Sequence, residues 1–181
     1  MPQVVLPLAP RTRRRRLLAR AHGDPSRARA GADAPAPQDA RAPARAAAPH
    51  APFRMLIVDD DPLMTDMLPR RLRRVLRDNV DIRTAATPDE AADIIRELQP
   101  DAILSDYNLR QMRTGLDVLR EAEQHAPNAA RILFSGHAAR EIDGLQDASV
   151  HAYIEKPMRL DELVTPVLEA IERATGQDLR G

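Results

Sequence analysis

The sequence predicts an α/β fold of three layers, in which a doubly wound, five-stranded parallel sheet lies between two layers of helices. Two observations carry this prediction. Short apolar segments alternate along the chain with longer segments whose apolar residues recur at helical spacing. Four of the five apolar segments also run directly into polar or charged residues, as expected where the carboxyl ends of parallel strands form a ligand site.

Five apolar segments are the expected strands, and they cover residues 55–58, 80–84, 102–104, 132–134 and 150–154. The first reads Met-Leu-Ile-Val without interruption, which is typical of a strand buried on both faces. The second alternates apolar and polar residues, which favours an edge or half-buried position.

Five helices are expected between and after these strands. The first covers about 63–76 and contains Pro69, which should kink it. The second begins at Thr87-Pro88-Asp89-Glu90, which supplies an N-cap, a proline at the first helical position and a Glu three residues on. The other three are a helix that opens at Thr114-Gly115, a weakly patterned stretch at 139–145, and a last helix at 161–174.

Composition separates an N-terminal extension from the rest of the chain. Residues 1–52 contain ten Arg against three Asp, and nine of the 16 prolines. With few bulky apolar residues, this segment is expected to be disordered. Its cluster Arg11–Arg16 could contact nucleic acid or an anionic membrane, but Met55 beside the first strand favours translated upstream sequence. Residues 53–175 are the expected domain, and 176–181 a short tail.

Two whole classes of protein are excluded by composition. The chain contains no Cys, so disulfide frameworks and thiol chemistry are ruled out. Its apolar runs stay well short of the roughly 20 residues that a transmembrane helix needs.

Charged and polar residues gather at the predicted carboxyl ends of the strands. Asp59-Asp60-Asp61 follow the first strand, Asp106 the third, Ser135 the fourth and Lys156 the fifth. These ends share one edge of a parallel sheet, so we expect a single cleft. Crowded carboxylates raise one another's pKa unless a cation lies among them, and oxygen ligands suit Mg²⁺. For the acidic triplet alone, a turn that caps the next helix is an equal alternative, since Asp is a good N-cap and Pro62 suits the first helical position.

Over about residues 54–174, the chain resembles the receiver domain of two-component response regulators. The resemblance lies in Asp59-Asp60, Asp106, Ser135 and Lys156-Pro157, in this order at the strand ends, and in Tyr153 three residues before the Lys. It implies a flavodoxin-like fold of the single-domain, chemotaxis-regulator-like type, and a phosphoprotein of phosphorelay signal transduction.

The resemblance also implies a role for each site residue. Asp106 would be the phosphoacceptor. Mg²⁺ would be held by Asp60, by Asp106, by the backbone carbonyl of Asn108 and, largely through water, by Asp59.

The remaining motif residues would respond to the phosphoryl group. Ser135 would hydrogen-bond it, Lys156 would pair with it, and Ser135 and Tyr153 would form the switch. The Lys156-Pro157 peptide bond would be cis, an uncommon feature. The loop after Asp106 departs from the family pattern, since Arg110 stands where Pro is common and one residue more precedes Gly115.

The implied function is that of a stand-alone, cytoplasmic receiver that catalyses only its own phosphorylation and dephosphorylation. A sensor histidine kinase or histidine phosphotransfer protein would supply the phosphoryl group. The output would be contact with a downstream protein, or with a second copy of this chain, through the fourth helix, fifth strand and fifth helix. We expect no membrane partner, because the apolar runs are too short to span a bilayer. We also do not expect nucleic-acid binding, because no helix-turn-helix or zinc motif follows the last helix.

Two other functions stay open. One is a nucleic-acid-binding regulator that uses the Arg-rich arm. The other is a phosphohydrolase with an Asp-x-Asp nucleophile pair from Asp59–Asp61, although Leu63 stands where such enzymes usually have Thr.

Overall fold

A computed structural model of the chain describes residues 4–5, 51–76, 79–110, 112–147, 150–157 and 159–179. Five parallel strands confirm the predicted sheet, and they are β2 Phe53–Val58, β3 Val80–Ala85, β4 Ala102–Asp106, β5 Ala130–Ser135 and β6 Ala152–Glu155. Their order across the sheet is β6-β5-β4-β2-β3. The chain therefore leaves β2 towards β3 on one side and returns to β4 on the other, which makes the β2–β4 boundary the switch point where such sheets bind ligands.

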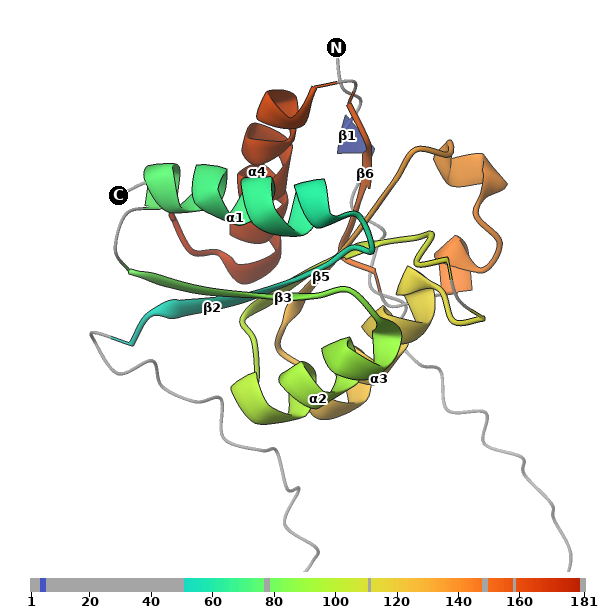
Figure 1. The fold of residues 1–181 in the computed structure, drawn as a ribbon, viewed down its shortest axis with the longest axis horizontal. Coiled ribbons are helices and arrows are strands. Elements are labelled where there is room, and N and C mark those ends of the chain that lie inside the picture. Colours follow the sequence, from blue (N-terminus) through green and yellow to red (C-terminus); the bar gives the residue numbers. More distant parts are fainter. Residues whose placement is uncertain are drawn as a thin grey trace, which may run out of the picture. The chain divides into compact units, whose positions relative to one another are not determined.

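Four α-helices complete the three layers, and they are α1 Pro62–Leu76, α2 Pro88–Leu98, α3 Gly115–His125 and α4 Val164–Thr175. Figure 1 shows α1 and α4 on one face of the sheet and α2 and α3 on the other. This arrangement confirms the flavodoxin-like, doubly wound class. Among the described helices, none is both long and apolar enough to cross a membrane.

Strand β2 explains why its sequence is apolar at every position. Met55 and Ile57 point to the core that α1 and α4 cover, whereas Leu56 and Val58 point to the core under α2 and α3. All four side chains are fully buried, because successive residues of a strand face opposite sides of a sheet and helices cover both.

The helix expected at 139–145 does not form. The chain there makes two short 3-10 turns, η1 Ala139–Glu141 and η2 Leu145–Asp147. Only Ile142 and Leu145 are buried apolar residues in this stretch, which is too few for a helical stripe. Gly144 between them has a positive φ of 76°, a conformation that does not continue a helix.

Two prolines lie inside helices, as the sequence indicated. Helix α1 continues on both sides of the buried Pro69. The last helix begins later than expected, at Val164, after a 3-10 turn η3 Leu160–Leu163. Pro166 therefore falls in the first turn of α4, where its missing N–H would have had no partner within the helix.

One segment of the N-terminal extension departs from the expected disorder. Val4–Val5 form a short strand, β1, that pairs antiparallel with β6, with Val5 opposite Tyr153. β1 lies beside β6 in Figure 1, so the sheet has a sixth strand that the sequence analysis did not predict. Residues 1–3 and 6–50 lie outside the described residues.

Candidate functional site

Three carboxylates meet at the carboxyl edge of the sheet. Asp59 and Asp60 directly follow β2, and Asp106 ends β4, whose Ser105 is in register with Val58. One oxygen of each carboxylate lies within 4.8 Å of the others. Asp59 is 1% exposed and Asp106 6%, so two of the three acids are largely withdrawn from water. An all-oxygen donor set of this kind fits Mg²⁺ or a similar hard cation.

Asp61 belongs to the helix rather than to this cluster. Its Oδ1 accepts a hydrogen bond from the backbone N–H of Leu63 at 2.9 Å, and its own N–H donates to Asp59 Oδ1 at 2.8 Å. The capping explanation therefore holds for Asp61, whereas Asp59 and Asp60 form the cluster.

Lys156 forms ion pairs with two of the three acids. Its Nζ lies 3.1 Å from Oδ2 of Asp59 and 2.9 Å from Oδ2 of Asp106. The same ammonium lies 4.6 Å from the centre of the Phe134 ring, close enough for a cation–π contact.

Burial and ion pairing shift the pKa values of Lys156 and Asp59 in opposite directions. Burial alone would lower the pKa of Lys156, but its hydrogen bonds and ion pairs with Asp106 and Asp59 outweigh burial and raise the pKa. Burial, together with the negative charge of Asp106, raises the pKa of Asp59 by more than the Asp61 N–H and Lys156 lower it. The ionised form of Asp59 is therefore stabilised when a further positive charge approaches.

The third acid of the cluster, Asp60, forms an ion pair with Arg110. Arg110, in the loop between β4 and α3, places its Nε 2.8 Å from Oδ2 of Asp60. In the sequence, Arg110 stands out only because it departs from the family pattern, and that departure is the one signal of this contact.

Ser135 ends β5 and is 1% exposed. Its Oγ accepts a hydrogen bond from the His137 N–H at 3.1 Å and lies 3.2 Å from His137 Nδ1. Its backbone carbonyl accepts from the N–H of Lys156 at 2.7 Å. The serine is therefore tied both to the lysine of the acid cluster and to the loop that follows β5.

Tyr153 is connected to that same loop. Its side chain is buried, and its hydroxyl donates a hydrogen bond to the backbone carbonyl of His137. Burial, followed by the charges of Glu155 and Glu141, raises the pKa of Tyr153 to about 12, so the hydroxyl keeps its proton. His137, two residues after Ser135, therefore contacts both positions that the family resemblance assigns to the switch.

The Lys156-Pro157 peptide bond corrects an expectation. The structure contains no cis peptide bond among its described residues, so this bond is trans. The trans isomer of an X–Pro bond is favoured by about 0.5–1 kcal/mol, and the contacts of Lys156 with Ser135, Asp59 and Asp106 are made with it.

The loop between β4 and α3 closes tightly on Asp106. The N–H of Gly115 donates to the carbonyl of Tyr107 at 3.0 Å. A Cβ atom at Gly115 would lie 1.9 Å from the backbone oxygen of Asp106, so a residue with a side chain does not fit. Asn108 is exposed, and its Oδ1 accepts from the N–H of Arg110 at 3.3 Å.

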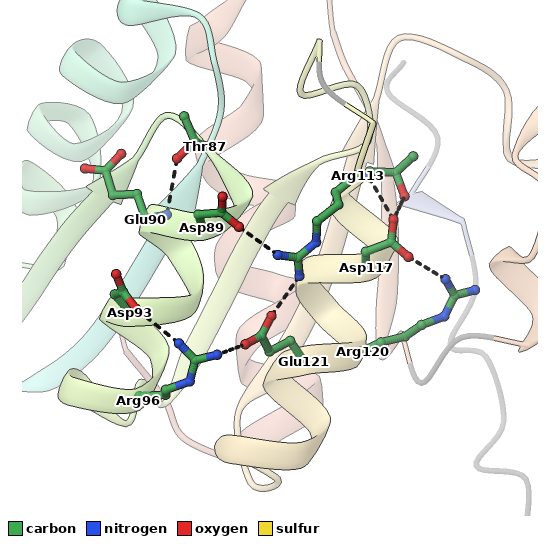
Figure 2. A network of polar contacts seen from close by, with 10 residues as sticks. Thr87, Asp89, Glu90, Asp93, Arg96, Arg113, Asp117, Arg120 and Glu121 are labelled. Carbon is green, nitrogen blue, oxygen red and sulfur yellow. Dashed lines mark hydrogen bonds and ion pairs between the residues drawn. The ribbon is translucent and has the colours of Figure 1, made fainter.

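A network of ion pairs holds the far end of this loop (Figure 2). Arg113 reaches Asp89 of α2 at 3.1 Å and Glu121 of α3 at 2.7 Å. Arg96 of α2 pairs with the same Glu121. Glu121 is only 15% exposed and therefore joins the two helices and the loop through one carboxylate.

Comparisons with known proteins agree with this geometry. A family model described as the response regulator receiver domain matches residues 55–168. The hydrogenase transcriptional regulatory protein HoxA of Cupriavidus necator is 32% identical over 129 residues, which are 70% of this chain and 25% of that protein. The probable transcriptional regulatory protein TcrX of Mycobacterium tuberculosis is 33% identical over 127 residues, which are 69% of this chain and 52% of that protein. The chain thus spans between a quarter and about half of these curated relatives.

A solved structure supports the same assignment. A CheY-like response regulator receiver domain protein from Methanospirillum hungatei superposes with a TM-score of 0.60 at 26% identity. The superposition covers 71% of this chain and 100% of that one.

Proposed function

This chain belongs to the response regulator receiver domain family, and from that membership we propose that Asp106 accepts a phosphoryl group in a Mg²⁺-dependent reaction. The observation that carries the proposal is the position of the Asp106 carboxylate, which lies beside Asp59 and Asp60 and pairs with Lys156. The family implies a histidine kinase as partner, so the donor is a phosphohistidine of a sensor kinase or of a phosphotransfer protein.

The reaction is a displacement at phosphorus. A carboxylate oxygen of Asp106 forms the new P–O bond while the P–N bond of the phosphohistidine breaks. The leaving imidazole keeps the electron pair and takes up a proton. Because nucleophile and phosphoryl group are both anionic, the site has to supply positioning and positive charge.

The residues around Asp106 supply both. Asp59, Asp60, Asp106 and the backbone carbonyl of Asn108 would hold Mg²⁺, which when bound neutralises charge on the transferring group. Lys156 then exchanges its contact with the Asp106 carboxylate for the phosphoryl oxygens. The Ser135 hydroxyl donates to another of these oxygens, which are strong acceptors.

The signal leaves the site through the loop after β5. Ser135 and Tyr153 both bond to His137, so movement of Ser135 toward the phosphoryl group changes the position of the Tyr153 partner. The affected surface consists of η1, η2, β6 and α4, and it would bind a downstream protein or a second copy of this chain. Phosphorylation shifts a pre-existing equilibrium between two arrangements of this loop.

Control of transcription is a second candidate for the output. Two relatives that the chain matches are named as transcriptional regulators. The expectation that nucleic acid takes no part therefore loses support, and the surface above would act on transcription through whatever it contacts.

Intact-mass measurement tests the acceptor. The full chain is incubated with acetyl phosphate, with Mg²⁺ or with EDTA, as wild type, as Asp106→Asn and as Asp93→Asn, an exposed acid of α2. We expect one added phosphoryl group in the wild type and in Asp93→Asn, only with Mg²⁺, and none in Asp106→Asn. Equal incorporation in Asp106→Asn would remove the assignment.

A further inference from the structure

Each carboxylate of the acid cluster is paired with a side-chain cation in this structure. Lys156 pairs with Asp59 and Asp106, and Arg110 pairs with Asp60. Three acids, one ammonium and one guanidinium leave a single negative charge, whereas the acids alone would repel one another strongly.

The two cations are held very differently. The Lys156 side chain is 28% exposed and lies over the Phe134 ring, with contacts to two acids. The Arg110 side chain is 78% exposed, and its contact with the cluster is Asp60. The guanidinium can therefore leave the cluster for water at little cost in burial, and Lys156 cannot.

The Arg110 side chain that reaches Asp60 comes from a strained turn of the loop. Arg110 has a positive φ of 48°, a left-handed conformation that costs a residue with a Cβ about 1–2 kcal/mol. The turn is closed by the hydrogen bond from its N–H to the side chain of Asn108. The ion pair with Asp60 offsets part of this strain, which accounts for an arginine at a position that would otherwise favour Gly or Asn.

We infer that Arg110 is a built-in counter-ion that competes with a divalent cation for Asp60. This inference rests on the proposed function, in which Asp60 is a Mg²⁺ ligand. Without the metal, the guanidinium neutralises Asp60 and stabilises the crowded acids. When Mg²⁺ binds, it takes the place of the guanidinium, and the charges of the three acids, Lys156 and the metal balance. The competition raises the Mg²⁺ concentration at which the site fills.

The inference predicts two effects of opposite sign for Arg110→Gln. Mg²⁺ should bind about two- to fivefold more tightly, the size expected when a solvent-exposed ion pair no longer competes. The metal-free protein should melt at a lower temperature, because Asp60 has lost its counter-ion. Both effects should shrink as salt is added, since exposed charges are screened.

The test is calorimetric titration of the full chain with MgCl₂ at low ionic strength, without any phosphodonor. Four proteins are compared, namely wild type, Arg110→Gln, Arg110→Lys and Arg113→Gln. Arg113 lies in the same loop but pairs with Asp89 and Glu121, so its variant removes the same charge without touching the acid cluster. We expect tighter binding for Arg110→Gln, a nearly wild-type constant for Arg110→Lys, and little change for Arg113→Gln. In the wild type, the NMR signal of the Arg110 Nε–H should shift on addition of Mg²⁺, and that of Arg113 should not.

The outcomes separate this inference from the proposed function. If the wild type binds Mg²⁺ and Arg110→Gln binds it equally well, the competition is wrong and the metal site stands. An equal gain in Mg²⁺ affinity in Arg110→Gln and Arg113→Gln would show a general effect of loop charge and would also overturn the inference. Absence of Mg²⁺ binding by the wild type would overturn both proposals.

Discussion

The hydroxyl of Tyr153 donates a hydrogen bond to the backbone carbonyl of His137, and the N–H of that same His137 donates to the Oγ of Ser135. Two residues from different strands are thereby joined through a single peptide segment. Ser135 ends β5 at the carboxyl edge of the sheet, where Asp106 ends β4, whereas Tyr153 lies in β6, which is part of the surface proposed for output.

Removal of the Tyr153 hydroxyl tests this coupling. In Tyr153→Phe the backbone carbonyl of His137 loses its hydrogen bond from the Tyr153 hydroxyl, which should cost about 1 kcal/mol of unfolding free energy. We expect beryllofluoride, a phosphoryl mimic, to slow amide exchange at 136–145 and at 152–156 in the wild type. In Tyr153→Phe the effect should stay at 136–145 and disappear from 152–156.

The matched control for this experiment is Tyr107→Phe. Tyr107 contacts His137 edge-on through its ring, with the ring centres 6.2 Å apart, and this contact does not need the hydroxyl. Its exchange pattern should follow the wild type. A Tyr153→Phe protein that responds to beryllofluoride like the wild type in both segments would refute the coupling.

Gly115 is required by the close approach of the start of α3 to the backbone of Asp106, at the end of β4. In Gly115→Ala the new methyl group would overlap the Asp106 carbonyl, so the loop has to move and stability should fall by about 1–3 kcal/mol. The displaced acceptor should also take up phosphate more slowly. Urea unfolding and the rate of phosphorylation measure the two effects.

Gly136→Ala supplies the comparison for stability. A Cβ at Gly136 would have no neighbour within 4 Å, so its unfolding free energy should change by less than about 0.5 kcal/mol. If both glycine variants are equally stable, the steric explanation for Gly115 fails.

Glu121 should contribute more to stability than the other acids of its network. Its carboxylate accepts from both Arg96 and Arg113 and is mostly buried, so Glu121→Gln leaves two guanidinium groups with weaker partners. We expect a loss of about 1–2 kcal/mol. Asp93→Asn removes an acid that is 84% exposed, and such pairs contribute at most about 1 kcal/mol. Thermal unfolding at low and high salt compares them, and a larger loss for Asp93→Asn would contradict the network.

The strand ends could be predicted from the sequence because parallel topology leaves little freedom. Once β2, β4 and β6 were recognised as buried apolar segments, their carboxyl ends had to share one edge. Asp59, Asp106 and Lys156 therefore had to lie close together, and their contacts in the structure agree.

Other features depended on backbone details that leave no periodic pattern. The contact of Arg110 with Asp60 is made from an irregular loop in which Arg110 has a positive φ, and residue types alone do not specify such a loop. The two-residue strand β1 is too short to produce an alternation. The isomer of the Lys156-Pro157 bond is decided by tertiary context, with only a small intrinsic preference.

The last prediction concerns the pH dependence of stability. His151 precedes β6, and its Nδ1 accepts a hydrogen bond from the backbone N–H of Arg131 at 2.9 Å. A ring nitrogen that accepts from a peptide N–H carries no proton, so the bond exists only in the neutral imidazole. Burial, together with the charge of Arg131 and against that of Glu123, lowers the pKa of His151.

The sign of the effect follows from linkage. Because the folded-state pKa lies below the ordinary value of about 6.5, the unfolded chain binds the proton first as the pH falls. The stabilisation is complete above the unfolded pKa and is lost as the pH falls toward the folded pKa, with a slope of at most about 1.4 kcal/mol per pH unit. In His151→Asn the side-chain oxygen can still accept from Arg131 but does not titrate. Between about pH 7 and pH 5, the free energy of unfolding measured with urea should therefore fall less steeply in His151→Asn than in the wild type. The control is His125→Asn, at an exposed histidine of α3, and its curve should follow that of the wild type. Parallel curves for all three proteins would show that His151 does not couple protonation to folding.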